Sequence, residues 1–533
     1  MNSTSLNSPT WSLTGAHRRA GALVSPRDGL AAVLIALVVC AVFVPALQGG
    51  FVDWDDYRNF LENPRYRGLG AGQISWMLAS IHTGHWIPMT WLTLGLDYVI
   101  WGLDPFGYHL TSVLLHGANA ALFFLVAARL LSNAAVAASP DAVRMGAFVA
   151  TLAFAVHPLR VESVAWVTER RDVLSGMFAL VTVLAYLKAH TPETTHPARW
   201  RIAALLAFAL AIMSKSIVVS LPAVLLVLDA YPLRRIGGGR WREAVPVFRE
   251  KLPFVALAAM GTLVAVLAAR LNGIFTPLDS VSMSERVGLV TYSVWFYLSR
   301  TLAPLNLSPL HGLPPSLDLF QPRFIGSFVA VTLVVALAWR SRSWWPALPA
   351  ALLSYLVLLA PVSGLLHNGA QIVAERYSYL SCMPWALLLG GAICWLARRG
   401  GPIPVGGRRL AMAAVAVWLL WLSGLTMGQI GVWRDTGTLW RATLAADPSC
   451  SACHYEYGIH LRKAGDPEGG MAHLTRALAL RPTRQGLLRY LVQSVLIRHS
   501  LDEVDKAHEE LGVLMSLSPT AGEFVGRLVV TDW

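Results

Sequence analysis

The chain has 533 residues, of which 55% are hydrophobic and only 14% are charged, and its mean hydropathy is +0.52. This composition excludes an ordinary soluble protein of this length and predicts an α-helical, polytopic membrane protein. The formal net charge of +12 gathers in short connections between apolar segments, which is typical of membrane topology rather than of nucleic-acid binding.

Eleven apolar segments are long enough, or nearly long enough, to cross a bilayer as helices. Basic residues fall in alternate connections, from Arg18 and Arg19 before the first segment to Arg408 and Arg409 before the last. The positive-inside rule makes these connections cytoplasmic, so we expect the N-terminus inside and the C-terminal region outside. No cleavable signal is evident, and the first segment is expected to be a retained anchor. The predicted spans are about 29–48, 107–131, 145–158, 172–189, 201–214, 217–232, 251–270, 324–340, 346–361, 378–397 and 411–430.

An acidic motif follows the first predicted span at the extracytoplasmic face. It reads Phe51-Val52-Asp53-Trp54-Asp55-Asp56-Tyr57, with three carboxylates within four residues. Taken alone, such a motif fits a solvated loop as well as a catalytic one. The aromatic segment 86–101 and the apolar segment 284–301 are expected to be interfacial helices rather than spans. The predicted outer connections are 49–106, 271–323 and 362–377.

Further ionisable groups gather at the same predicted membrane face. Such groups are costly at membrane depth, and they usually pair or line a polar cavity. Salt-bridged helix ends explain any one of them, but they explain the one-sided set poorly. The set comprises His157, Glu162, Arg170 and Asp172 around the third and fourth spans, Lys215 between the fifth and sixth, and Glu375, Arg376, Tyr377 and Tyr379 at the start of the tenth.

The composition becomes soluble after Trp433. Pro448 and Pro482 are 34 residues apart, and small and apolar residues between them match a tetratricopeptide repeat. Segments 436–448 and 485–519 resemble a partial and a degenerate repeat. A short helical solenoid is therefore predicted, with a protein-binding or peptide-binding surface. A cap that merely packs on the membrane domain is the alternative.

The five cysteines are too few for a disulfide framework. Cys450-Ser451-Ala452-Cys453-His454 matches the c-type haem attachment pattern, but nothing else indicates electron transfer. A local disulfide or two free thiols are the favoured interpretations. No set of zinc ligands stands out.

An ordered series of short motifs resembles the transmembrane and tetratricopeptide-repeat O-mannosyltransferases, which are GT-C glycosyltransferases, and in particular a bacterial member. The resemblance covers nearly the whole chain. It predicts a cytoplasmic segment 1–28, a GT-C domain 29–432 and a repeat domain 433–533. The motifs are Phe51-Val52 with Asp55-Asp56, Trp86 through Trp91, His157-Pro158 with Glu162 and Arg170/Asp172, Lys215, and Glu375-Arg376 through Tyr379.

The resemblance implies transfer of a sugar, expected to be mannose, from a polyprenyl-phosphate carrier to a hydroxyl of a protein acceptor. The location implied is a bacterial inner membrane, with the repeats periplasmic or extracellular. The expected partners are the lipid-linked sugar, a protein or peptide acceptor and membrane lipid, without nucleic acid. A divalent metal is left open as a cofactor, and no metal ligand is assigned.

Roles follow from the matching motif positions. Asp55 is the expected base that deprotonates the acceptor hydroxyl, and Asp56 is expected to orient the acceptor or cap a helix, although the two roles are exchangeable. Asp53 is expected to be solvated. The donor phosphate is expected to bind cations, with Lys215, Arg300 and Arg376 ahead of Arg170. Arg300 is included only for its place in the predicted interfacial helix. The alternative for each cation is a structural pairing with Glu375, Asp172 or Glu162. The remaining site-lining candidates are His85, Trp86, His157, Glu162, Asp172, Glu375, Tyr377 and Tyr379.

Two other functions are weighed against this one. A GT-C transferase that moves another lipid-linked sugar onto lipid or glycan is the nearest. A transporter or a repeat-bearing scaffold is the alternative of a different class, but a transporter predicts internal repeats and polar residues near mid-bilayer. The ionisable groups here gather at one face instead.

Overall fold

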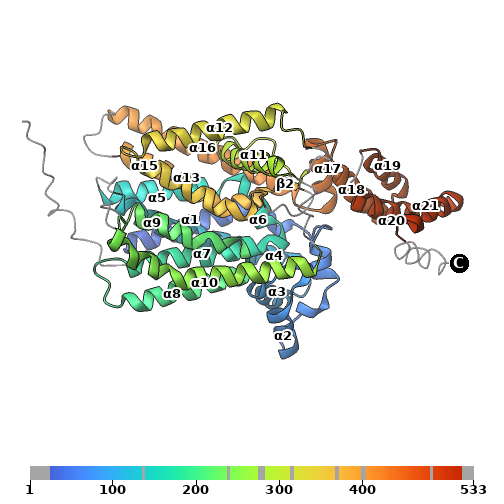
Figure 1. Cartoon of the computed structure of the whole chain (residues 1–533), viewed down its shortest axis with the longest axis horizontal. Helices are drawn as coiled ribbons and strands as arrows, with labels where there is room; N and C mark the ends of the chain where they lie inside the picture. Colours follow the sequence, from blue (N-terminus) through green and yellow to red (C-terminus); the bar gives the residue numbers. More distant parts are fainter. Residues whose placement is uncertain are drawn as a thin grey trace, which may run out of the picture.

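The computed structural model describes residues 25–134, 139–236, 241–273, 282–312, 317–365, 371–397, 404–480 and 484–518. A bundle of long helices makes up most of the molecule, and a smaller group of helices extends from one end of it (Figure 1). The described residues are almost entirely helical, as predicted. Most of the predicted segment 1–28, together with Pro482 and residues 519–533, lies outside these ranges.

Each of the eleven predicted spans coincides with an apolar helix or helix pair. Among the described residues, seven helices are long and apolar enough to cross a membrane, and two further pairs, bent by 59° and 51°, raise the number to nine. The remaining two of the eleven predicted segments, Ser216–Ala230 and Ala347–Val362, are shorter apolar helices. The eleven-span topology and its sidedness therefore stay predictions. The bundle consists of α1 (Pro26–Phe43), α4 (Pro105–Asn133), α5 (Pro140–Ala155), α7 (Arg170–Ala189), α8 (Pro197–Ser214), α9 (Leu221–Ala230), α10 (Trp241–Leu271), α12 (Pro322–Ser341), α13 (Ala347–Leu359), α15 (Met383–Leu396) and α16 (Val405–Val432).

Small residues bring helices of the bundle close together. A Cβ added at Gly146 on α5 would lie 2.5 Å from the carbonyl oxygen of Gly390 on α15. The reverse contact, from Gly390 to the carbonyl oxygen of Gly146, would be 2.6 Å. Because any side chain here would force the backbones apart, these glycines allow the close helix contact that stabilises membrane bundles.

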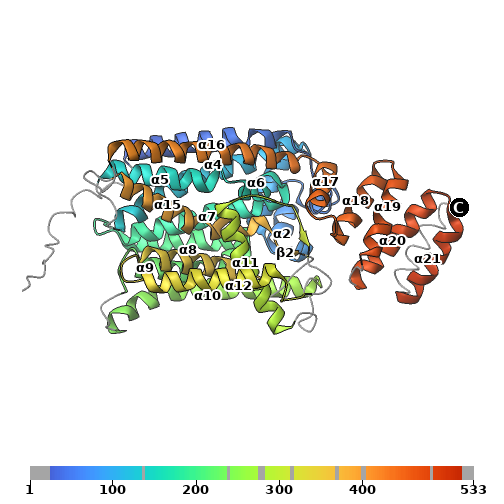
Figure 2. The ribbon, with the colours of Figure 1, turned by 90° about the horizontal axis from the view of Figure 1, so that it is seen from above.

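Short elements gather at the end of the bundle from which the C-terminal helices extend (Figures 1 and 2). The two predicted interfacial segments form α3 and α11, and neither is among the candidate spans of the described residues. Two strands pair antiparallel in the same region. These elements are η2 (Tyr57–Leu61), η3 (Pro64–Tyr66), α2 (Ala71–Ala79), η4 (His82–Gly84), α3 (Pro88–Trp101), η5 (Pro158–Arg160), α6 (Val161–Ala165), η6 (Val167–Glu169), η7 (Ser216–Ser220), α11 (Met283–Leu302), β1 (His311–Gly312), η9 (Ala360–Val362), β2 (Gln371–Val373), η10 (Glu375–Tyr377) and α14 (Ser378–Ser381); η1 (Val44–Gln48) continues α1.

The two bent helix pairs meet through buried polar contacts. Arg160 donates hydrogen bonds to the carbonyl oxygen of Ser378 at 2.7 Å and to its Oγ at 2.8 Å. Glu162 Oε2 accepts the backbone N–H of Arg376 at 2.7 Å. Irregular backbone at membrane depth persists only where protein groups satisfy it. These contacts therefore fix both breaks and bring the segments 158–172 and 375–379 together.

The C-terminal helices form successive antiparallel neighbours (Figure 2). A Cβ added at Gly458 would lie 2.9 Å from the carbonyl oxygen of Gly470, and the reverse contact has the same length. The predicted small positions of the repeat thus lie where two helices approach most closely. Cys450 and Cys453 form a disulfide, one of the two favoured interpretations, and it leaves neither sulfur for haem. The helices are α17 (Thr436–Ala446), α18 (Ser451–Lys463), α19 (Pro467–Ala479), α20 (Arg484–Ser500) and α21 (Val504–Leu517).

Candidate active site

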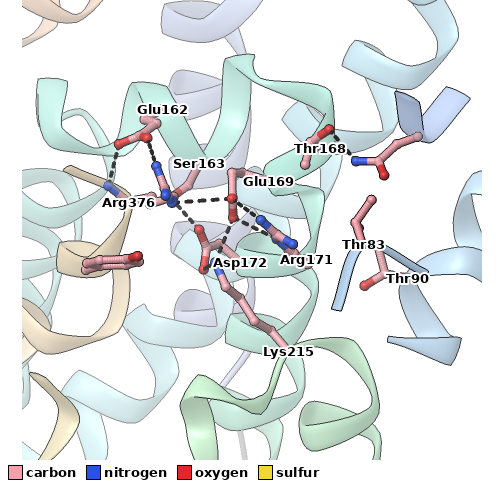
Figure 3. Close-up of polar contacts among 12 residues, drawn as sticks. Thr83, Thr90, Glu162, Ser163, Thr168, Glu169, Arg171, Asp172, Lys215 and Arg376 are labelled. Carbon is pink, nitrogen blue, oxygen red and sulfur yellow. Dashed lines mark hydrogen bonds and ion pairs between the residues drawn. The ribbon is translucent and has the colours of Figure 1, made fainter. Parts of the chain in front are cut away.

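A buried cluster of ion pairs lies where the broken helices meet the N-terminus of α7 (Figure 3). Glu169 is at its centre. The Glu169 carboxylate accepts two hydrogen bonds from Arg171, at 2.5 and 3.1 Å. It also lies 2.6 Å from Lys215 Nζ and 3.3 Å from Arg376 Nε. One carboxylate therefore holds three cations from three separate parts of the chain.

Two further carboxylates complete the cluster. Lys215 Nζ lies 2.7 Å from Asp172 Oδ1, and the Ser163 hydroxyl donates to Asp172 Oδ2 at 3.2 Å. Arg376 also pairs with Glu162. Three carboxylates thus face three cations, so the cluster is balanced in charge. Burying this many charges is costly unless they are paired and hydrogen-bonded, which accounts for the density of contacts.

Asp55 lies beside this cluster and is not locked into it. It is half-buried, and among the described residues no hydrogen bond or ion pair involves its carboxylate. Burial raises the pKa of Asp55, Glu169 raises it further, and the positive charges of Arg171, Arg376 and Arg58 act in the opposite direction. An unpaired carboxylate with a raised pKa next to the arginine and lysine side chains of the cluster has the properties of a general base.

Asp56 is engaged entirely with its own surroundings. It is fully buried. Its carboxylate accepts the backbone N–H of Val52 at 3.0 Å, and the backbone N–H and hydroxyl of Thr168 at 3.0 and 2.6 Å. Desolvation raises the pKa of Asp56 to about 7, against the lowering effect of these hydrogen bonds. Asp56 therefore joins the acidic loop to η6, which favours a structural role over contact with an acceptor.

The four predicted phosphate-binding cations separate into two pairs. Lys215 and Arg376 belong to the cluster. Arg170 is fully buried, pairs with Asp97 and donates to the carbonyl oxygen of Tyr108 at 2.7 Å, so the structure does not support a phosphate role for it. Arg300 lies over the ring of Phe296, with 5.4 Å from its Cζ to the ring centroid, within α11. This contact lies within α11 and not in the cluster.

The predicted lining residues divide in the same way. Tyr377 lies under the Arg376 guanidinium, with 5.0 Å from the Arg376 Cζ to its ring centroid. His85 is exposed in the loop before α3, within range of the charges of Arg171 and Lys215. Glu162 and Asp172 are members of the cluster described above.

The other four candidates hold the scaffold. Trp86 Nε1 donates to the carbonyl oxygen of Leu78 at 2.8 Å, and the Tyr379 hydroxyl accepts from Asn119 Nδ2 at 2.7 Å. His157 accepts the backbone N–H of Leu159 at 3.2 Å. Glu375 accepts the backbone N–H of Ser308 at 2.6 Å. Tyr379 nonetheless borders the recess described below.

Sequence reasoning did not assign roles to four residues of this region. Glu169 and Arg171 belong to the same charged run as Arg170, but successive helical residues point about 100° apart. A shift of one residue therefore decides whether a side chain faces the cluster or the opposite side. The charged run 169–172 was the only local sign that these residues belong to the site. Thr168 holds Asp56. Arg58 is exposed, and no described residue pairs with its guanidinium.

An apolar cavity of about 600 Å³ runs between α4, α7, α9, α13 and α15. Its lining on α13 extends from Ala347 to Leu358, about 17 Å along a helix. A small recess of about 10 Å³ lies next to it, and Asp172, Arg376 and Tyr377 are among the residues that border it. Leu358 and Leu380 border both spaces. The apolar cavity therefore ends beside the ion-pair cluster.

Sequence comparison connects this geometry with known proteins. The chain is 24% identical over 527 residues to the protein O-mannosyl-transferase TMTC1 of Homo sapiens, an alignment that covers 89% of this chain and 57% of that protein. It is 25% identical to the protein O-mannosyl-transferase Tmtc3 of Drosophila melanogaster, an alignment that covers 87% of this chain and 57% of that protein. The predicted resemblance to the O-mannosyltransferase family is confirmed. The chain spans 57% of the length of these relatives, and no family model matches it.

One solved structure also aligns with the chain. It is ArnT from Cupriavidus metallidurans bound to undecaprenyl phosphate, with 17% sequence identity, 85% of this chain and 75% of that chain covered, and a TM-score of 0.35. This score is too low to establish a common fold. Among the residues that the structure describes, no group of three or more His, Cys, Asp or Glu side chains is arranged to hold a metal ion.

Proposed function

We propose that the chain transfers a sugar, with mannose the first candidate, from a polyprenyl-phosphate donor to a hydroxyl of a protein acceptor at the extracytoplasmic membrane face. The observation that carries this proposal is the unpaired Asp55 carboxylate beside a cation cluster at the end of an apolar cavity. The names of the relatives support the choice of mannose and of a protein acceptor. The bacterial inner membrane is the proposed location.

The apolar cavity and the cation cluster beside it are the proposed sites for the tail and the phosphate of the donor. Its polyprenyl tail would occupy the apolar cavity. Because the tail comes from lipid that is as apolar as the cavity lining, packing and shape rather than transfer from water would determine its affinity. Its phosphate would then lie beside Arg376 and Lys215, where the recess of about 10 Å³ has to widen to admit it. Both cations already have carboxylate partners, so the phosphate exchanges contacts within a preformed cluster. Such charge-assisted hydrogen bonds stabilise the leaving phosphate.

Transfer is a single displacement in this arrangement. The acceptor hydroxyl gives its proton to Asp55 as its oxygen forms a bond to the anomeric carbon. The bond between that carbon and the phosphate oxygen breaks, and the lipid phosphate leaves with the electron pair. One base is sufficient, and the configuration of the anomeric carbon inverts.

The proposed function is tested with the purified protein in lipid. A panel of polyprenyl-phosphate sugars is supplied with a Ser/Thr-rich peptide, and the release of lipid phosphate is measured. Mannose is expected to give the fastest release, coupled to one sugar added per phosphate released. Release from a donor with a different sugar, and not from the mannose donor, would show that the enzyme transfers that sugar instead. Absence of release from every donor would contradict the proposal.

The phosphate site predicts a difference between two variants of one ion pair. Arg376→Gln and Glu162→Gln both break the buried pair, but only the first removes a cation from the recess. Arg376→Gln is expected to weaken donor binding by about 1.5–3 kcal/mol, the contribution of a charged hydrogen bond. Donor titration of both variants checks this, and equal losses would indicate that Arg376 acts only through Glu162.

The tail site predicts a dependence on carrier length. Ala351 is buried and lines the apolar cavity from α13, so Ala351→Phe fills part of it. The variant is expected to lose about tenfold in affinity for long-chain donors, or about 1.4 kcal/mol, because the ring occupies volume that the tail needs. The loss is expected to be much smaller for a donor with a short tail. Equal affinities of variant and wild type for long-chain donors would place the tail elsewhere.

The pH dependence follows from the raised pKa of Asp55. Only the ionised carboxylate accepts a proton, so the rate falls as pH decreases through this pKa. The acidic limb of kcat is therefore expected above the ordinary value for Asp, about 3.9. A pH profile measured with saturating substrates checks this, with the melting temperature followed in parallel. An acidic limb at or below the ordinary value would count against Asp55 as the base.

A further inference from the structure

The loop that carries Asp55 is held from outside the membrane bundle. The backbone N–H of Gly50 donates to the carbonyl oxygen of Arg434 at 2.9 Å, and the backbone N–H of Asp53 donates to the Thr436 hydroxyl at 2.9 Å. Arg434 lies just before α17, and Thr436 is its first residue. Two backbone positions of the loop are thus fixed by residues nearly four hundred positions later in the chain.

A charged contact adds to these hydrogen bonds. Lys463 Nζ, at the end of α18, lies 2.6 Å from Asp53 Oδ2. The same ammonium lies over the Tyr57 ring, 5.4 Å from its centroid. Asp53, expected from the sequence to be solvated, therefore connects the acidic loop to the C-terminal helices.

Four tryptophan rings form a continuous series of contacts across the junction, here called the stack, in which the Trp54–Trp440 pair is tilted and the other two pairs are stacked. Trp54 packs on Trp440 of α17 at 5.2 Å between centroids and on Trp166 at 4.9 Å, and Trp166 stacks on Trp433 at 5.3 Å. The Arg376 Cζ lies 5.6 Å from the centroid of the Trp166 ring. The stack therefore extends from α17 through the Asp55 loop to the cation cluster.

We propose that α17 and α18 position the Asp55 loop for transfer, so that Lys463, Thr436 and Trp440 are positioning residues of the active site. Asp55 has neighbours on both sides that are held, Asp53 and Trp54 by the C-terminal helices and Asp56 by Thr168, while its own carboxylate is unpaired. A base is effective when the surrounding backbone is fixed and the reacting group is not engaged. This inference rests on the proposed function and extends it.

The inference differs from the sequence-based expectation for this region. A separate acceptor-binding platform would change acceptor binding and leave the chemical step intact. A positioning role instead predicts a fall in kcat. Measuring kcat, the KM of the donor and the KM of the acceptor separately therefore distinguishes the two roles.

The test uses the full chain with two variants: Lys463→Ala removes the contacts with Asp53 and with the Tyr57 ring, and Thr436→Val removes the hydrogen bond from Asp53. Because Lys463 is partly exposed and partly exposed ion pairs contribute little to stability, the first variant is expected to fold. Thr436→Val is nearly isosteric. Lys506→Ala is the matched control, since it breaks a similar ion pair, with Glu503 at 3.0 Å, on α21 at the far end of the C-terminal helices (Figure 1).

The two variants are expected to lower kcat about tenfold and to change the acceptor KM less than twofold. Lys463→Arg is expected to restore most of kcat, and Lys506→Ala to match the wild type. Unchanged kcat, or a rise in the acceptor KM alone, would overturn the inference. A wild type that uses no lipid-linked donor would instead reject the proposed function.

Hydrogen exchange followed by mass spectrometry tests positioning without turnover. Peptides that cover residues 50–57 are expected to exchange faster in Lys463→Ala and Thr436→Val than in the wild type or in Lys506→Ala. Unchanged exchange in both variants would show that the loop keeps its position without these contacts, and this would overturn the inference whatever the activity.

Discussion

Asp55→Asn is expected to lower the transfer rate by about 10²–10⁴ and to leave folding and membrane insertion intact. The amide is nearly isosteric with the carboxylate but does not accept the proton of the acceptor hydroxyl. No described residue depends on the Asp55 carboxylate for a hydrogen bond, so the protein is expected to unfold at the wild-type temperature. Single-turnover transfer from a labelled donor, with a melting curve of the same sample, measures both properties.

The neighbouring carboxylates provide matched controls. Asp53→Asn weakens only the contact with Lys463, so its effect on rate is expected to be far milder than that of Asp55→Asn. Asp56→Asn places an amide NH₂ among the three donors that the carboxylate now accepts, and its main expected effect is loss of stability. Full turnover by Asp55→Asn together with a stable, inactive Asp56→Asn would reverse the two roles.

Arg170→Ala is expected to destabilise the protein by about 3–5 kcal/mol, because it leaves the buried Asp97 carboxylate without its charged partner. Both side chains are almost completely buried in this pair. Asp97 would retain only the Thr111 hydroxyl as a side-chain donor, at 2.8 Å. Thermal unfolding in detergent or in nanodiscs, with the wild type in parallel, gives the difference.

Variants of the Arg170–Asp97 pair distinguish a structural role of Arg170 from phosphate binding. Replacing both partners, as in Arg170→Met with Asp97→Leu, is expected to recover much of the lost stability, because the unpaired charge is removed as well. Donor affinity of the folded single variant is expected to equal that of the wild type. A loss of donor affinity at unchanged stability would return Arg170 to the phosphate site.

The membrane helices were predictable because their signal is local. An apolar segment of sufficient length forms a helix in a bilayer whatever its neighbours, and all eleven predicted segments are helical. The one-sided clustering of Lys215, Arg376 and Asp55 was also visible, because the order of spans determines which connections share a face. The two shortest segments, 216–230 and 347–362, leave the number of spans open because length alone does not decide it.

Individual roles within the site were less predictable. In the run 169–172, rotation about the helix axis decides which arginine faces the cluster, and this rotation depends on the position at which α7 begins. His157 Nε2 lies 3.2 Å from the carbonyl oxygen of Thr301 on α11, and Glu375 accepts the backbone N–H of Ser308, and both partners are distant in sequence. The stack from Trp440 through Trp54 forms only when the C-terminal helices dock. No local pattern records these contacts, because they result from tertiary packing.

The most direct test of the central claim, a single displacement with Asp55 as the base, is the configuration of the product. Purified protein receives a polyprenyl-phosphate sugar of known anomeric configuration and a peptide acceptor, and NMR of the glycopeptide reports the new linkage. The predicted result is complete inversion, with one lipid phosphate released per sugar transferred and no product from Asp55→Asn. Retention of configuration would contradict the account, because it requires a covalent intermediate and a second displacement.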